Sequence, residues 1–215
     1  MKHLLIILSI TISVNSFSQT KLTRVKHMKK STRKAYLQYK LDRLKETTFR
    51  FPCGDSVGTG YYIAQGFQDN INGCGDHLGL DINGLGGGDT DLGDTIYSIG
   101  YGIVAQADSS DYLAIYYKHH GKIIKTVYYH CKEIFYKAGD LIPKGYPIAT
   151  IGNSDGIYLA HLHLEIITDT IISCGFYGEP KGFIDPIEIL PFHEKKKKLI
   201  QKERRDLYTI NKNIK

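Results

Sequence analysis

The chain has 215 residues, of which 42% are hydrophobic and 23% are charged, and these proportions are those of an ordinary globular protein. They exclude collagen-like, coiled-coil and wholly disordered chains. The formal net charge of +6 is unevenly distributed, since residues 19–50 carry +9 and residues 193–215 carry +6, whereas residues 51–192 carry −10. Phosphate contacts need basic residues on the folded surface, so the acidic middle argues against nucleic acid as a partner.

The first eighteen residues have the order of an export signal. Lys2 provides a positive charge, and residues 4–12 are almost entirely apolar. Ser16 and Ser18 are the small residues expected before a cleavage site. The apolar run is about half of the ~20 residues that span a bilayer, so no transmembrane segment is expected in the mature chain. We predict a signal peptide over residues 1–18 and export to the periplasm or the extracellular space; the alternative is a hydrophobic first element of the fold.

Residues 21–47 carry apolar side chains three and four positions apart among many lysines and arginines. This pattern predicts a loosely amphipathic helix, or a tail that folds only on contact with a partner. It lies within a basic N-terminal extension over residues 19–50, and a basic C-terminal tail covers residues 193–215.

From Phe51 onward the pattern changes to short runs rich in Ile, Val, Tyr and Thr, separated by Gly, Asp and Asn. Such runs predict an antiparallel all-β domain over residues 51–192. The strands expected in it are Thr95–Ile99, Gly102–Ala107, Tyr112–Tyr117, Ile123–His130, Tyr146–Ile151 and Leu159–Ile167.

The four cysteines, Cys53, Cys74, Cys131 and Cys174, form an even set that suits an oxidising compartment. None belongs to a C-x-x-C pair, which argues against a thiolate zinc site. Four cysteines allow three pairings. We favour disulfides Cys53–Cys74 and Cys131–Cys174, and the alternative is free buried thiols.

A histidine and an aspartate lie at even spacing on either side of Gly79. Nearby Gly75 and Gly84 argue against a helix here, and on a strand His77, Gly79 and Asp81 share one side. Gly79 lacks the side chain that would fill the space for a cation. Imidazole and carboxylate are both good zinc ligands, so the pair is a candidate for metal binding.

A second motif is Ala160-His161-Leu162-His163-Leu164-Glu165. The spacing sends His161 and His163 to one face of a strand and the two leucines into the core. Glu165 lies on the histidine face and could orient a ligand histidine. The alternative is two half-exposed histidines with no shared role.

The third motif ends in His130, after the β-rich run Thr126–Tyr129. A lone histidine of this kind is usually a satisfied, partly buried polar residue. His119 and His120 precede Gly121 and predict a hairpin turn at the surface. The remaining histidines lie outside the candidate site: His3, His27 and His193.

Together and in this order, the three motifs resemble those of the lysostaphin-like, LytM-type zinc metalloendopeptidases, a family of peptidoglycan hydrolases. That family carries H-x-x-x-D, Tyr-x-His and H-x-H, which stand here as His77-Leu-Gly-Leu-Asp81, Tyr128-Tyr-His130 and His161-Leu-His163. The resemblance covers about residues 55–190 and extends through three further segments: Gly93–Ala107, Lys137–Gly152 and Asp185-Pro186.

The resemblance implies an antiparallel β metallopeptidase domain with one zinc ion held by His77, Asp81 and His163 and a fourth position open to water. It also implies that His130 and His161 transfer protons and stabilise the oxyanion. Which of the two takes the first proton stays open.

The leading hypothesis is an exported zinc endopeptidase that cuts peptide bonds in the stem peptides or cross-bridges of bacterial peptidoglycan. A second is a non-catalytic relative that binds wall peptides or regulates an amidase partner. Loss of a ligand or catalytic histidine would mark that state, and all five residues are present. A third is a basic exported protein that binds an anionic polymer through its tails. The basic extensions either are solvated tails or concentrate the protein on an anionic envelope surface.

Overall fold

The computed structural model describes residues 38–70, 75–108, 111–168, 177–178 and 181–193. These residues fall into two compact units that divide between Arg43 and Leu44. In the first unit residues 38–41 are helical, within the range where the amphipathic pattern predicts a helix. The predicted signal peptide and all of the C-terminal tail beyond His193 lie outside the described residues. Among the described residues, no helix is both long enough and apolar enough to cross a membrane.

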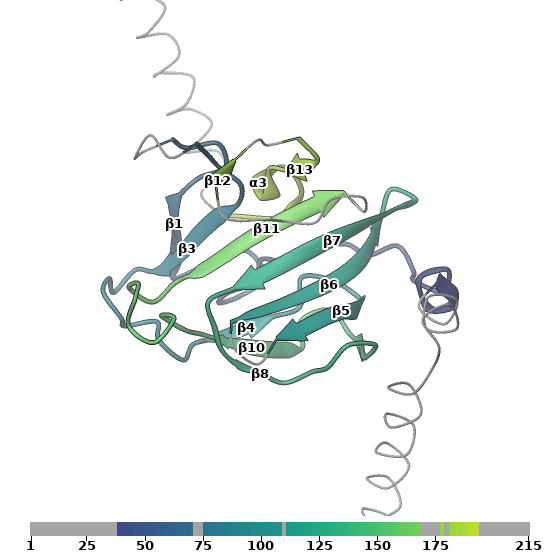
Figure 1. Ribbon diagram of the computed structural model, residues 1–215, viewed down its shortest axis with the longest axis horizontal. Coiled ribbons are helices and arrows are strands. Elements are labelled where there is room, and N and C mark those ends of the chain that lie inside the picture. Colours follow the sequence, from purple (N-terminus) through teal and green to yellow (C-terminus); the bar gives the residue numbers. More distant parts are fainter. Residues whose placement is uncertain (1–37, 71–74, 109–110, 169–176, 179–180, 194–215) are drawn as a thin grey trace, which may run out of the picture. The chain divides into compact units, whose positions relative to one another are not determined.

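The second unit is built on an eight-stranded antiparallel sheet (Figure 1). Seven strands follow one another across it, and the eighth pairs only with the third of them. In spatial order the seven are β1 (Tyr61–Gln65), β3 (Leu80–Gly84), β11 (Leu162–Thr168), β7 (Lys122–Tyr129), β6 (Tyr112–His119), β5 (Gly102–Asp108) and β9 (Leu141–Ile142), and β13 (Phe183–Ile184) pairs with β11. The predicted antiparallel all-β fold is therefore confirmed.

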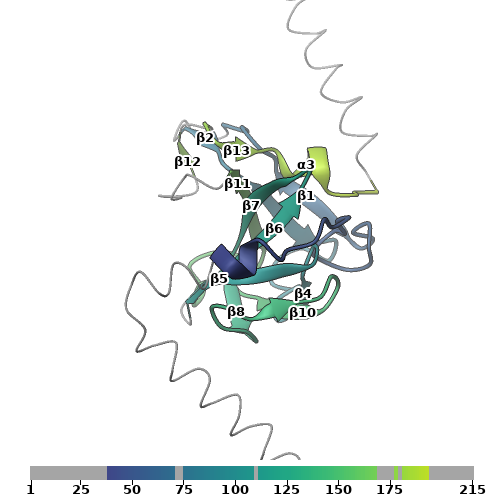
Figure 2. The same cartoon turned by 90° about the vertical axis from the view of Figure 1, so that its right-hand side faces the viewer.

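Two smaller sheets contain the other strands of the described residues. One contains β4 (Thr95–Tyr97), β10 (Pro147–Ile151) and β8 (Cys131–Ile134), and the other pairs β2 (Asp76–His77) with β12 (Tyr177–Gly178). The three-stranded sheet lies on the side of β5 in both views (Figures 1 and 2). A single core of buried side chains joins it to the main sheet, since Ile148 and Ile151 belong to the same cluster as Ile115 and Leu162.

The turn predicted at His119–Gly121 joins β6 to β7. His119 pairs with Lys122 across a two-residue loop, and His120 and Gly121 have φ angles of 48° and 76°. Positive φ at both central residues is typical of hairpin turns whose twist matches the flanking strands. The turn is thus a surface hairpin, as the sequence predicts.

Strand β11 is buried on both faces. Leu162 and Leu164 are completely buried in the main core, as predicted. His163 and Glu165 lie on the opposite face and are 1% and 0% exposed. β11 lies between β3 and β7, and its polar face is shielded from water like its apolar face. The alternative of two half-exposed histidines is therefore wrong for His163.

The domain includes residues that the sequence pattern assigns to the basic extension. Leu44 is 3% exposed, and the Arg50 backbone amide donates to the Ile99 carbonyl at 2.9 Å. At the other end, Asp185 caps the short helix α3 (Pro186–Ile189) by accepting a hydrogen bond from the Ile187 amide. Described residues of this unit thus run from Leu44 to His193.

The favoured disulfide pairings are wrong. Cys53 and Cys131 are free and buried, and the Cys131 thiol donates to the Tyr128 carbonyl at 3.5 Å. Burial, as the main cause, raises the pKa of both thiols. Both thiols therefore stay protonated. The count and spacing of cysteines carry no information about their burial in the core. Cys74 and Cys174 lie outside the described residues.

Candidate metal centre

His77, Asp81 and His163 come together from three strands of two different sheets. The even spacing predicts that His77 and Asp81 share one strand, and this prediction is wrong because the chain bends at Leu78 and Gly79. His77 belongs to β2 and pairs with Tyr177 of β12. Asp81 belongs to β3 and lies directly opposite His163 of β11 in the main sheet. The bend turns the His77 side chain back towards the other two.

Gly79 allows the bend to pass close to β11. A Cβ atom at this position would lie 2.4 Å from the Leu164 carbonyl oxygen and 2.9 Å from Nε2 of His163. The space beside Gly79 is therefore filled by β11 and the His163 ring. The sequence suggests that a cation lies in this space, and that suggestion is wrong. A glycine is needed here because real Cβ atoms do not approach backbone oxygens so closely.

Replacing Gly79 with alanine is expected to displace His163. Overpacking of this kind costs about 1–3 kcal/mol of stability, and metal affinity should fall with it. Gly121→Ala is the matched control, because its Cβ would meet nothing within 4 Å and its cost of about 1 kcal/mol arises from its positive φ alone. Urea unfolding and zinc titration measure both effects. Unchanged zinc affinity in Gly79→Ala would contradict the expectation.

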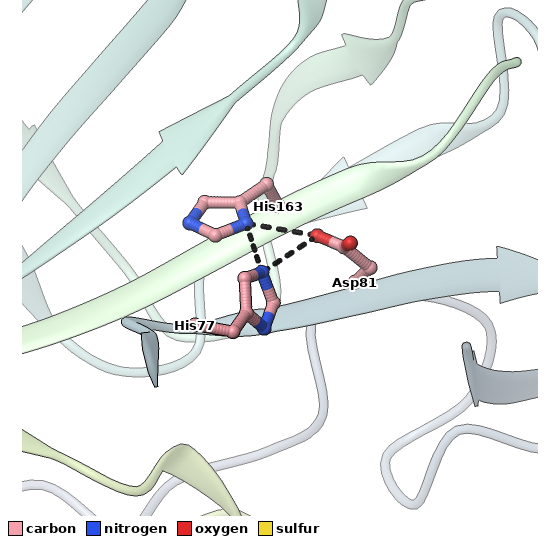
Figure 3. A group of neighbouring side chains, drawn as sticks. All are labelled: His77, Asp81 and His163. Atoms are coloured by element: carbon pink, nitrogen blue, oxygen red, sulfur yellow. Dashed lines mark hydrogen bonds and ion pairs between the residues drawn. The ribbon is translucent and has the colours of Figure 1, made fainter. Parts of the chain in front are cut away.

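The three candidate ligand atoms form a small triangle (Figure 3). Nε2 of His77 lies 3.0 Å from Nδ1 of His163 and 3.3 Å from Oδ1 of Asp81, and the last two atoms are 2.8 Å apart. A tetrahedral ion with ligand bonds of 2.0–2.1 Å separates its ligand atoms by about 3.3 Å. The triangle thus fits a metal ion after a small expansion, and the residues could hold one.

Each histidine has an acceptor for its other ring nitrogen. Nδ1 of His77 lies 2.9 Å from the Gly66 carbonyl oxygen, and Nε2 of His163 lies 3.4 Å from Oε1 of Glu165. With a metal bound, these acceptors would take the one proton of each neutral ring, so that Nε2 of His77 and Nδ1 of His163 are free to bind the ion. Glu165 thus lies where the sequence predicts an orienting carboxylate.

The charged groups of the centre shift one another's pKa values. Burial of Asp81 opposes its ionisation, but hydrogen bonds from His163 and His77 outweigh burial and hold the pKa of Asp81 well below its usual range. Burial likewise opposes protonation of His163, yet the carboxylates of Asp81 and Glu165 raise its pKa. Without a metal the centre therefore keeps an ionised carboxylate next to a basic imidazole, and a cation and a proton compete for the same nitrogen.

The two remaining histidines of the motifs lie beside the triangle. The rings of His130 and His161 are 4.6 Å apart, and Nε2 of His161 lies 3.8 Å from Oδ1 of Asp81. The Nδ1 atom of His161 lies 2.7 Å from the Leu159 carbonyl oxygen, which favours a proton on Nδ1 and leaves Nε2 towards the centre. All five residues singled out in the sequence are therefore brought into one cluster.

A serine and an aspartate hold His130, and sequence patterns do not reveal either one. Nδ1 of His130 lies 2.9 Å from the Ser154 hydroxyl, which donates to Asp111 at 3.3 Å. Asp111 and Ser154 are separated in sequence and belong to no motif, so only the fold shows that they meet. His130 also has a φ of 60°, which is unusual for a residue other than glycine.

The two tyrosines before His130 have separate roles. Tyr128 is completely buried, and its hydroxyl lies 2.9 Å from that of Tyr117 within the core. Tyr129 points to the other face, with its ring 5.6 Å from that of His163. Strand alternation places Tyr129, and not Tyr128, beside the candidate centre.

His130 is expected to make the metal-free protein less stable in acid. Burial, followed by the neighbouring His161 and His163, lowers the pKa of His130 to about 3. The unfolded chain takes up this proton near pH 6.5, so the stabilisation present above pH 6.5 is lost as the pH falls towards 3. The loss amounts to about 2 kcal/mol between pH 6.5 and 4.5. Urea unfolding across this range should show a smaller decline in His130→Gln than in the wild type, and equal declines would count against the low pKa.

The family comparison agrees with this geometry. Residues 75–172, which include all five site residues, match the model of peptidase family M23. These residues form an M23 domain. No match was found among curated protein sequences. The M23 domain is therefore assigned by its family model, and peptidase is the class of activity that the family indicates.

Solved structures with a similar fold include several peptidases. A zinc-containing peptidase from Vibrio cholerae is 26% identical, with 65% of this chain and 39% of that chain covered and a TM-score of 0.48. The catalytic domain of the antimicrobial peptidase lysostaphin from Staphylococcus simulans is 20% identical, with 60% and 90% covered and a TM-score of 0.46. The catalytic domain of the prophage-encoded M23 protein EnpA from Enterococcus faecalis is 20% identical, with 63% and 95% covered and a TM-score of 0.44. The chain thus spans less than half the length of the Vibrio protein.

Proposed function

We propose that this protein is an exported zinc endopeptidase that hydrolyses peptide bonds in bacterial peptidoglycan, in stem peptides or cross-bridges. The observation that carries the proposal is the convergence of His77, Asp81 and His163 with two further imidazoles within an M23 domain. A structural zinc site has four protein ligands, whereas three protein ligands with an open position are typical of catalytic zinc. The resemblance of the motifs to those of peptidoglycan hydrolases supports the substrate class.

In this proposal one zinc ion is held by Nε2 of His77, Oδ1 of Asp81 and Nδ1 of His163. Bound zinc lowers the pKa of a coordinated water and polarises the scissile carbonyl. His161 directs an unprotonated Nε2 towards the centre and can accept a proton there. His130 is neutral above about pH 3 and is held by Ser154, so it can exchange a proton with the reacting groups. The two imidazoles together supply one acceptor and one donor.

Exposed apolar side chains on both sides of the centre are suited to a peptide. Tyr158 is 46% exposed, and its ring lies 5.2 Å from that of His130. On the other side, Tyr177 is 37% exposed, and its ring lies 5.5 Å from that of His77. Ile157 and Leu159 are also exposed beside Tyr158. Such side chains offer contact area to a substrate backbone that crosses the centre.

Mass spectrometry of fragments released from defined peptidoglycan tests the proposal. The zinc-loaded wild type is expected to release muropeptides cut at one type of peptide bond, and the metal-free protein none. Stoichiometric zinc without release of any fragment would contradict the enzyme and favour the non-catalytic binding module. Cleavage at a sugar bond, or at the amide between sugar and peptide, would contradict the proposed bond class.

The basic extensions are proposed to retain the enzyme on an anionic envelope surface. Attraction of this kind weakens as the Debye length shrinks from ~10 Å at 0.1 M salt to ~3 Å at 1 M. Full-length protein is expected to pellet with isolated envelopes at low salt and to remain in solution at high salt. A version limited to residues 44–193 should pellet less at low salt and cleave a small soluble peptide equally well. Equal pelleting of the two versions would contradict the proposed retention, and the extensions would then act only as spacers.

A further inference from the structure

Three segments of the chain meet at His130, the residue between β7 and β8. Asp111 directly precedes β6, and Ser154 lies in the turn after β10. Nδ1 of His130 lies 2.9 Å from the Ser154 hydroxyl, and that hydroxyl donates to Oδ1 of Asp111 at 3.3 Å. The side chain of His130 is 4% exposed, and that of Asp111 is 34% exposed. One hydroxyl thus connects a buried imidazole to a partly exposed carboxylate.

The single proton of the Ser154 hydroxyl sets the direction of both hydrogen bonds. Burial raises the pKa of Asp111, and hydrogen bonds from Ser154 and from the His130 backbone amide limit the rise. Because a third of its side chain remains exposed, Asp111 is ionised at neutral pH and accepts the serine proton. The serine oxygen is then left to accept from Nδ1 of His130. Oδ1 of Asp111 lies 3.7 Å from the same nitrogen, and its negative charge also favours a proton there.

The backbone around His130 is strained, and hydrogen bonds hold it in place. The φ angle is 60° at His130 and 48° at Ser154, in a region that residues other than glycine seldom adopt. The His130 carbonyl accepts from the Gly152 amide at 2.6 Å, and the Cys131 amide donates to the Asp111 carbonyl at 2.9 Å. Such strain persists where the surrounding structure enforces it, and it is typical of functional sites. The backbone thus ties His130 to both segments that supply its partners.

With Nδ1 engaged, Nε2 is the nitrogen of His130 that is left for a reacting group. A neutral ring that carries its proton on Nδ1 has a lone pair on Nε2. His161, whose ring lies 4.6 Å away, has its Nδ1 at 2.7 Å from the Leu159 carbonyl oxygen. A backbone carbonyl thus holds His161, whereas a hydroxyl that another side chain orients holds His130. Substitution of those partners can therefore change the tautomer of His130 and leave that of His161 as it is.

We propose that Asp111 and Ser154 are positioning residues for His130, which fix its proton on Nδ1 and hold the ring so that Nε2 can take a proton from the reacting groups. This inference rests on the proposed function, in which His130 transfers a proton. A catalytic group that is misplaced by about 1 Å can cost a factor of about 10² in rate. A histidine held in the wrong tautomer can cost about 10⁴.

Long-range ¹H–¹⁵N correlation spectra of the ¹⁵N-labelled, full-length protein test the tautomer, because protonated and unprotonated ring nitrogens have different chemical shifts. The signals of His130 are assigned by their loss in His130→Gln. At neutral pH, with or without zinc, the wild type should carry the ring proton on Nδ1 of His130. Asp111→Ala frees the Ser154 hydroxyl to donate to Nδ1, so the ring proton should move to Nε2. The signals of His161 should not change, and they serve as the internal reference.

Ser154→Ala tests the positioning by kinetics. It removes the partner of Nδ1, so kcat on a wall peptide should fall about 10²-fold, while KM and the zinc content stay at the wild-type values. Asp140→Asn is the matched control. Asp140 is also a partly buried aspartate that accepts a backbone amide, from Lys137, but it lies before β9 at the edge of the main sheet. This variant should keep the wild-type kcat, and a thermal melt of each variant verifies that it is folded.

Two results would overturn the inference. One is a wild-type His130 with its proton on Nε2, or an Asp111→Ala variant in which the proton stays on Nδ1. The other is a folded Ser154→Ala variant with the wild-type kcat. A wild type that cleaves no wall peptide would contradict the proposed function instead, and the spectra would still decide whether Asp111 and Ser154 fix the tautomer.

Discussion

His163→Ala is expected to lose zinc and peptidase activity together. His163 provides the nitrogen that lies closest to Asp81, at 2.8 Å, and it is 1% exposed. Its removal leaves two ligands and a half-buried carboxylate whose low pKa depends on this imidazole. Asp81→Ala should have the same result. Zinc per chain, measured by mass spectrometry of the purified protein, and cleavage of a wall peptide give the two readouts.

Glu165→Gln is the graded control for this prediction. The amide oxygen can still accept from Nε2 of His163, but the negative charge is removed. Loss of an outer-shell partner typically lowers metal affinity or activity 10–100-fold, so zinc should bind more weakly and not vanish. A thermal melt of each variant separates metal loss from unfolding. If folded His163→Ala kept stoichiometric zinc, the ligand assignment would be wrong.

The alternation of side chains between the two faces of a strand explains how much of the site could be predicted from sequence. His161 and His163 share a face because they are two residues apart in extended chain at the start of β11, and the leucine between them enters the core. The hairpin at His120 and Gly121 follows from a short turn that needs positive φ at both positions. These features depend on neighbours within a few residues. Short-range patterns therefore predicted the strands that became β6, β7 and β11, but not which of them pair.

Long-range contacts explain what could not be predicted. The bend at Leu78 and Gly79 exists because β2 leaves the main sheet to pair with β12, about a hundred residues later in the chain. Likewise, Ser154 reaches His130 only because the turn after β10 folds back over the end of β7. Burial of Cys53 is also a property of the assembled core and not of cysteine spacing. Spacing rules cannot encode such contacts, because their partners are set by the tertiary fold.

His161→Ala is expected to separate catalysis from metal binding. Nε2 of His161 lies 3.8 Å from Oδ1 of Asp81, beside the triangle and outside it, so zinc should stay bound at full stoichiometry. The variant should lose the contribution of a proton-transfer group, which is a factor of ~10²–10⁴ in rate. His130→Ala should behave in the same way, since its ring lies 6.3 Å from that of His163.

Comparison of the two variants with His163→Ala decides the roles within the cluster. Equal zinc content in His161→Ala, His130→Ala and the wild type, with a large loss of kcat in both variants, is the expected pattern. If His161→Ala lost zinc while His163→Ala retained it, the two histidines of the H-x-H motif would have exchanged roles. If His130→Ala kept the full rate, the hydrogen-bonded chain Asp111–Ser154–His130 would have a structural role and no catalytic one. Its hydrogen bonds hold the turn after β10 whether or not a proton is transferred.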